Sequence, residues 1–114
     1  MKLWLLRHGE AEPHARTDAQ RELTRHGRKQ VMRSAAQLMG RPLTAILASP
    51  YVRTQQSAQL LRETLGLGLE IIMVPWLTPD ADWAEVVRQL DAYSYQEIVR
   101  VTHQPLVGDL GVML

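Results

Sequence analysis

Short apolar runs recur along the chain, and each of them stops at a polar or turn-forming position. The first run covers Leu3–Leu6 and stops at Arg7. Runs of this length are too short to cross a bilayer, and because they are apolar on both faces they are typical of strands buried in a parallel sheet. On this pattern we expect strands at residues 2–6, 45–48, 69–74 and 97–102.

Between these runs the apolar positions follow the period of a helix. Thr24 is a favourable N-cap for a first helix that ends at Gly40, and Ser49-Pro50 offers a serine cap and a first-turn proline to a second helix. Asp82 and Glu85 form a capping pair for a third helix, and a last helical segment begins at Pro105. The side chains that we expect these helices to bury are Val31, Met32, Ala35, Leu38 and Met39, then Ala58, Leu61 and Leu65, then Trp83, Val86, Val87 and Leu90.

Strands that alternate with helices predict an α/β fold, here a three-layer α/β/α arrangement with a mainly parallel sheet. The 114 residues are enough for one domain, which we expect to span residues 1–114. The polar stretch Glu10–Glu22 is predicted to be a loop that lies over the edge of the sheet.

Composition excludes several classes of function. A net charge of +1 indicates no general nucleic-acid or membrane surface, so neither partner is expected. The chain has no cysteine, which excludes disulfides, thiol catalysis and cysteine-ligated zinc. The N-terminal region lacks the pattern of a signal peptide, and we therefore expect a cytoplasmic protein.

Two predicted strands end in a histidine, His8 after the first and His103 after the fourth. Arg7 precedes His8, Arg53 follows the second strand, and Arg21 lies in the loop before Thr24, so up to three guanidiniums can meet two imidazoles at the carboxyl edge of the sheet, where open α/β sheets bind ligands. Arginine matches phosphate oxygens in a bidentate manner, and arginines without acidic partners imply an anionic ligand. The chain has neither an Asp-rich metal site nor a Walker-type loop, which leaves histidine to carry the chemistry as a nucleophile towards phosphorus.

The motifs Arg7-His8-Gly9 and Ser49-Pro50-x-x-Arg53, together with the late His103, resemble the histidine phosphatase superfamily, which has the phosphoglycerate mutase-like fold. Within that superfamily three further segments are most similar to SixA-type protein phosphohistidine phosphatases. These segments are residues 21–27, 77–79 and 103–108.

The resemblance implies that His8 is the nucleophile and is transiently phosphorylated, and that His103 contacts the same phosphoryl group. It implies that Arg7 and Arg53 bind the phosphoryl oxygens, with Arg21 facing the same pocket. No metal or organic cofactor is implied. The implied partner is a protein that carries phosphohistidine, such as a histidine-containing phosphotransfer domain in a signalling pathway.

The chain departs from the superfamily pattern in two places. Many members carry a glutamate or aspartate in the loop after the third strand as a general acid, and this chain has no glutamate at the expected place. The nearest substitute is Asp80, and Glu10 is another possibility. The sequence stops at Leu114 within an apolar segment, so we expect that the C-terminal helix and strand of the family fold are missing.

A missing acid bears on the substrate. An alkoxide leaving group benefits greatly from protonation, whereas transfer between two imidazoles is almost degenerate in leaving-group basicity. The sequence therefore favours a phosphohistidine substrate. A small-molecule phosphatase or mutase of the same superfamily is the first alternative, and a module that binds a phosphoprotein without turnover is the second.

Overall fold

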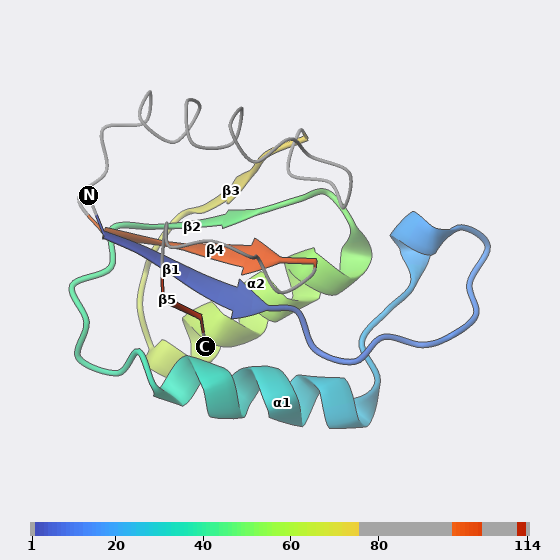
Figure 1. Ribbon diagram of the computed structural model, residues 1–114, viewed down its shortest axis with the longest axis horizontal. Helices are drawn as coiled ribbons and strands as arrows, with labels where there is room; N and C mark the ends of the chain where they lie inside the picture. Colours follow the sequence, from blue (N-terminus) through green and yellow to red (C-terminus); the bar gives the residue numbers. More distant parts are fainter. Residues whose placement is uncertain (1, 76–96, 104–111, 114) are drawn as a thin grey trace.

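The computed structural model describes residues 2–75, 97–103 and 112–113, and its sheet contains five parallel strands in the order β3-β2-β4-β1-β5 (Figure 1). The strands are β1 (Lys2–Arg7), β2 (Ala45–Ala48), β3 (Ile71–Met73), β4 (Glu97–Thr102) and β5 (Val112–Met113), and the helices are η1 (Asp18–Gln20), α1 (Arg25–Ala36) and α2 (Val52–Leu65). This arrangement confirms the predicted α/β fold with a parallel sheet. The predicted third helix, and the segment from Pro105 to residue 111, lie outside the described residues.

The predicted strands match the sheet closely. β2 and β4 have the predicted bounds, while β3 is shorter than the predicted 69–74. The expectation that the chain ends in a helical segment was wrong for residues 112–113, which pair with β1 as a fifth strand.

β4 lies between β1 and β2 at the centre of the sheet, although it follows both of them in the sequence. Its register pairs Arg7 with Thr102 and Leu6 with Val101. Because both strands run in the same direction, His8 and His103, which follow them, lie at the same level of the sheet. The backbone N–H of His8 donates to the carbonyl of Thr102 at 3.0 Å. The two histidines are therefore placed by strand register.

α1 and α2 pack against each other on one face of the sheet (Figure 1). As predicted, the hydroxyl of Thr24 caps α1 and accepts from the N–H of Gly27 at 2.9 Å. Two of the predicted buried side chains are exposed: Met32 is 41% and Met39 61% accessible. α1 ends at Ala36 and not at the predicted Gly40, so Met39 lies beyond the helix. The buried stripe is therefore narrower than predicted. It consists of Val31, Ala35 and Leu38.

The prediction that Ser49 caps the second helix with Pro50 in its first turn was wrong. α2 begins at Val52, and its N-cap is Tyr51, whose side chain makes no capping hydrogen bond. Ser49 is instead fully buried, and its hydroxyl bonds to other side chains. The inward face of α2 is as predicted, with Ala58, Leu61 and Leu65 buried. No helix in the described part of the chain is long and apolar enough to span a membrane.

Candidate active site

The two predicted histidines lie together at the carboxyl edge of the sheet. The ring centroids of His8 and His103 are 5.7 Å apart, and the rings meet edge to face at 66°. This proximity follows from the adjacency of β1 and β4, whose last residues share one level of the sheet.

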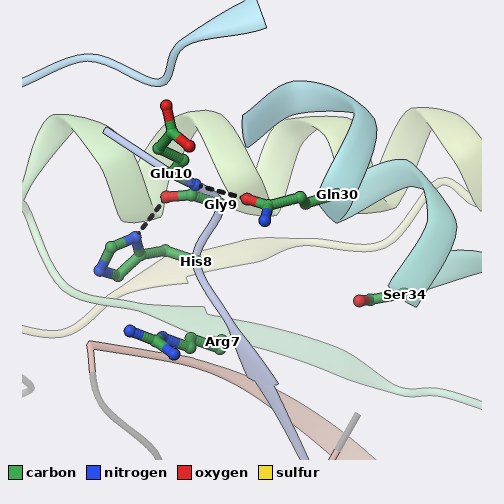
Figure 2. Close-up of a pocket in the computed structure, with 6 residues that line it drawn as sticks. All are labelled: Arg7, His8, Gly9, Glu10, Gln30 and Ser34. Atoms are coloured by element: carbon green, nitrogen blue, oxygen red, sulfur yellow. Dashed lines mark hydrogen bonds between the residues drawn. The ribbon is translucent and has the colours of Figure 1, made fainter. Parts of the chain in front are cut away.

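The loop after β1 is fixed against the start of α1 by two glycines. A Cβ on Gly9 would lie 2.6 Å from the carbonyl carbon of Gly27, and one on Gly27 would lie 2.7 Å from the backbone nitrogen of Glu10. The backbone of Glu10 also donates to the side chain of Gln30 at 2.9 Å and accepts from the N–H of Thr24 at 2.9 Å. These contacts set the direction in which the chain leaves β1 and so the position of the His8 ring (Figure 2).

His8 is half-buried, and its Nδ1 lies 2.6 Å from the carbonyl oxygen of Gly9 (Figure 2). A carbonyl only accepts hydrogen bonds, so the proton of a neutral ring is on Nδ1 and the lone pair is on Nε2. Burial lowers the pKa of His8 below 6.5, and the hydrogen bond to Gly9 opposes this shift. The positive charges of the three arginines lower the pKa further. Both effects of the surroundings that lower this pKa favour the neutral imidazole, which is the nucleophilic form.

The three predicted arginines differ in their surroundings. Arg7 is exposed and lines a pocket of about 350 Å³ beside His8. Arg53, in the first turn of α2, is only 5% exposed, and its guanidinium lies 4.9 Å from the centre of the Tyr51 ring. Arg21 donates through Nε to the carbonyl of Glu12 at 2.6 Å. All three are close enough for their charge to act on His8.

The expectation that these arginines have no acidic partner was wrong. Asp18, in η1, bridges two of them: its Oδ1 accepts from Arg21 at 3.0 Å and its Oδ2 from Arg53 at 3.2 Å. Its backbone carbonyl also accepts from Arg53 at 2.8 Å. The hydrogen bond to Arg21 is the main reason that the pKa of Asp18 is lowered. The loop before α1 thus neutralises part of the positive charge and holds both guanidiniums in place.

His103 is 7% exposed and is fixed from two sides. Its Nε2 lies 2.7 Å from the hydroxyl of Ser49, and the Tyr51 ring meets it edge to face at 4.9 Å. Burial lowers the pKa of His103 to about 4, and the positive charges of Arg53 and of the buried Arg100 contribute. With this pKa, the His103 ring is neutral at pH 7.

The contacts that these supporting residues make were not predicted from the sequence. Ser49 carried the signal of a helix cap, Asp18 that of an ordinary loop residue, and Arg100 lies within an apolar strand. Of the two candidate acids, Asp80 lies outside the described residues. Glu10 is exposed and lines the pocket with Gln30 and Ser34 (Figure 2). Its Oε1 accepts from the hydroxyl of Thr24 at 3.3 Å.

Comparison with known proteins agrees with this geometry. Residues 3–78 match the profile of the histidine phosphatase superfamily (branch 1). The chain is 32% identical to the phosphohistidine phosphatase SixA homolog of Haemophilus influenzae, with 96% of this chain and 74% of that protein covered. It is 31% identical to the phosphohistidine phosphatase SixA of Escherichia coli, with 96% and 71% covered.

A solved structure shows the same likeness in three dimensions. The structure of the protein histidine phosphatase SixA complexed with tungstate superposes with a TM-score of 0.85 at 30% identity, and 95% of this chain and 72% of that chain are covered. The chain therefore belongs to the histidine phosphatase superfamily, and within it to the SixA type.

Proposed function

We propose that this chain is a phosphohistidine phosphatase, which removes the phosphoryl group from a histidine-phosphorylated protein through a covalent intermediate on His8. Two relatives that share nearly a third of its residues are named for this activity. The observation that carries the proposal is the hydrogen bond from Nδ1 of His8 to the carbonyl of Gly9, because it leaves Nε2 as the nucleophilic atom.

In the first step Nε2 of His8 attacks phosphorus and the P–N bond of the substrate breaks. The substrate imidazole leaves with the electron pair of that bond, and it leaves as a neutral ring when its other nitrogen carries a proton. Nδ1 of His8 keeps its own proton and stabilises the new phosphoimidazolium through the carbonyl of Gly9. Water then attacks the phospho-His8 intermediate, which releases inorganic phosphate and restores the neutral imidazole.

The positive charges around His8 can stabilise a phosphoryl group in the transition state of its transfer. Arg7 and Arg53 are proposed to bind its oxygens, and His103 is proposed to contact the same group from the end of β4. Positive charge aimed at the equatorial oxygens is the main catalytic means available for phosphoryl transfer. A related SixA structure contains tungstate, a tetrahedral oxyanion. Arg21 acts on the site through its charge and through Asp18.

The leaving group distinguishes this function from a small-molecule phosphatase. Glu10 is the one candidate acid among the described residues, and its carboxylate bonds to Thr24. A substrate with an imidazole leaving group needs no strong acid, so we propose phosphohistidine protein in preference to alkyl phosphates.

The test is to incubate the enzyme with a protein that carries radiolabelled phosphohistidine and to stop the reaction with alkali. The released phosphate and the label bound to the enzyme are measured in the same samples. Wild type is expected to release phosphate and to carry a transient, acid-labile label. His8→Gln is expected to do neither, while His26→Gln, which changes an exposed histidine on α1, serves as the matched control. Release by His8→Gln at the wild-type rate would overturn the mechanism.

The same assay separates the alternatives. Turnover of p-nitrophenyl or alkyl phosphates as efficiently as of the phosphoprotein, abolished by Glu10→Gln, would identify a small-molecule enzyme. Tight binding of the phosphoprotein without phosphate release would identify a binding module.

A further inference from the structure

We propose that the hydroxyls of Ser49 and Thr54 act as a relay that fixes the tautomer of His103, so that Nδ1 is the ring nitrogen offered to the phosphoryl group. This inference rests on the proposed function for its consequence in catalysis, but the tautomer itself is independent of turnover. Ser49 and Thr54 are positioning residues here, because they act through His103 and touch no substrate.

The relay is a buried chain of three side chains. Ser49 and Thr54 have no exposed surface, and His103 is 7% exposed. The hydroxyl oxygen of Ser49 lies 2.7 Å from Nε2 of His103 on one side and 2.7 Å from the hydroxyl oxygen of Thr54 on the other. Because neither hydroxyl is exposed to solvent, neighbouring protein groups determine which atom donates in each of these hydrogen bonds.

The backbone settles the direction of the chain. The hydroxyl of Thr54 lies 2.8 Å from the carbonyl oxygen of Tyr51 and 3.1 Å from that of Ser49. Carbonyls cannot donate, so the Thr54 proton points to them, since an oxygen–oxygen contact of 2.8 Å without a hydrogen is repulsive. The oxygen of Thr54 must then accept from the Ser49 hydroxyl.

Once its proton is given to Thr54, Ser49 can only accept. It accepts from Nε2–H of His103, and its second lone pair faces the N–H of Tyr51 at 3.4 Å. Neutral His103 therefore carries its proton on Nε2. Nδ1 holds the lone pair, and it is buried without a hydrogen-bond partner among residues 2–75, 97–103 and 112–113.

This tautomer has a consequence for ligand binding. A lone pair on Nδ1 repels a phosphoryl oxygen, so binding of the anion is coupled to uptake of one proton by Nδ1, from solvent or from a monoanionic phosphoryl group. The resulting imidazolium donates through Nδ1 to the ligand and through Nε2 to Ser49. The lowered pKa of His103 agrees with this, because burial and nearby positive charge favour the neutral ring and an anion beside Nδ1 would oppose both effects.

The test reads the tautomer directly by long-range ¹⁵N–¹H correlation spectra, with His103→Gln used to assign the signals and tungstate as the probe anion. Free wild type is expected to show Nε2–H and a bare Nδ1, and saturation with tungstate is expected to protonate Nδ1. Thr54→Ser keeps the hydroxyl and is expected to retain the wild-type tautomer. Thr54→Val keeps the shape but frees the Ser49 proton, so it is expected to move the His103 proton to Nδ1.

Activity gives the second measurement. Ser49→Ala is expected to lower kcat about ten- to a hundredfold, the usual loss when a partner that orients a functional histidine is removed, while exposed Gln59→Ala on α2 is the control. A bare Nε2 in free wild type, or the wild-type tautomer in Thr54→Val, would overturn the relay. If wild type releases no phosphate from phosphohistidine protein, the proposed function fails, and the tautomer spectra still decide the relay.

Discussion

Gly27 occupies a helical position at which alanine should ordinarily be better. In an exposed helix interior, Gly→Ala gains about 1 kcal/mol. Here the added Cβ would lie 2.7 Å from the backbone nitrogen of Glu10, and closer still to its carbonyl oxygen. Carbon packs at about 3.5 Å or more, so the two backbones must separate by roughly 0.8 Å or more.

The loop after β1 has little freedom to yield. The backbone of Glu10 is tied to Gln30 and Thr24 by hydrogen bonds of 2.9 Å each. Overpacking of this kind costs about 1–3 kcal/mol. After allowance for the helical gain, we expect Gly27→Ala to lower the free energy of unfolding by about 0–2 kcal/mol, and to reduce phosphatase activity because His8 moves with the loop.

Urea unfolding and the phosphohistidine assay measure the two effects. Gly68→Ala is the matched control, since a Cβ there meets nothing within 4 Å, and it should be neutral or stabilising by about 0.4–1 kcal/mol. If Gly27→Ala is as stable as Gly68→Ala and equally active, the close approach of α1 does not position the catalytic loop.

Thr24, Gly66, Asp18 and His103 each give a further prediction. Thr24→Ala is expected to lower the free energy of unfolding by about 1 kcal/mol in urea titrations, because Gly27 loses its capping acceptor. Gly66→Ala should cost about 1–2 kcal/mol by the same measurement, since its φ of 63° is left-handed. Asp18→Asn is expected to tighten inhibition by inorganic phosphate by up to about fivefold, the worth of an exposed ion pair, because Arg53 loses its anionic partner; unchanged inhibition would show that Asp18 and phosphate do not compete. Stability should fall as pH drops from 6.5 towards 4, by at most about 3 kcal/mol, because His103 takes up a proton in the unfolded chain first. The loss should be clearly smaller in His103→Gln, where only the lowered pKa of His8 still contributes, and an equal loss in that variant would point to another group.

Much of the fold could be predicted from sequence patterns, because buried segments need apolar side chains at regular positions. β2 is apolar on both faces and β4 is buried along its whole length, and the bounds of both strands were predicted to the residue. The exposure of Met32 and Met39 was missed because the width of a buried stripe depends on how closely α1 approaches α2 and the sheet, which no local pattern records.

The two histidines of the site could be predicted from the sequence, whereas the contacts of the residues that hold the site in place could not. The alternation of strands and helices implies that His8 and His103 lie at the same edge of a parallel sheet, and the strand order of the structure makes them neighbours. Ser49 was misassigned because a serine before a helix has the same local signal whether it caps the helix or holds a histidine. The contact of Asp18 with Arg53 joins residues far apart in the sequence and depends on the path of a loop.

The central place of β4 also governs when the enzyme can exist during its synthesis. β1, β2 and β3 emerge from the ribosome first, yet β1 and β2 are joined into one sheet only when residues 97–102 pair with both of them. At ordinary translation speeds the interval between residues 75 and 103 is about 1–6 s. Throughout this interval His8 has been synthesised, whereas β4 and His103 have not. The two histidines of the site can therefore meet only after residues 97–103 have been made, and phosphatase activity is expected to require that β4 has paired with β1.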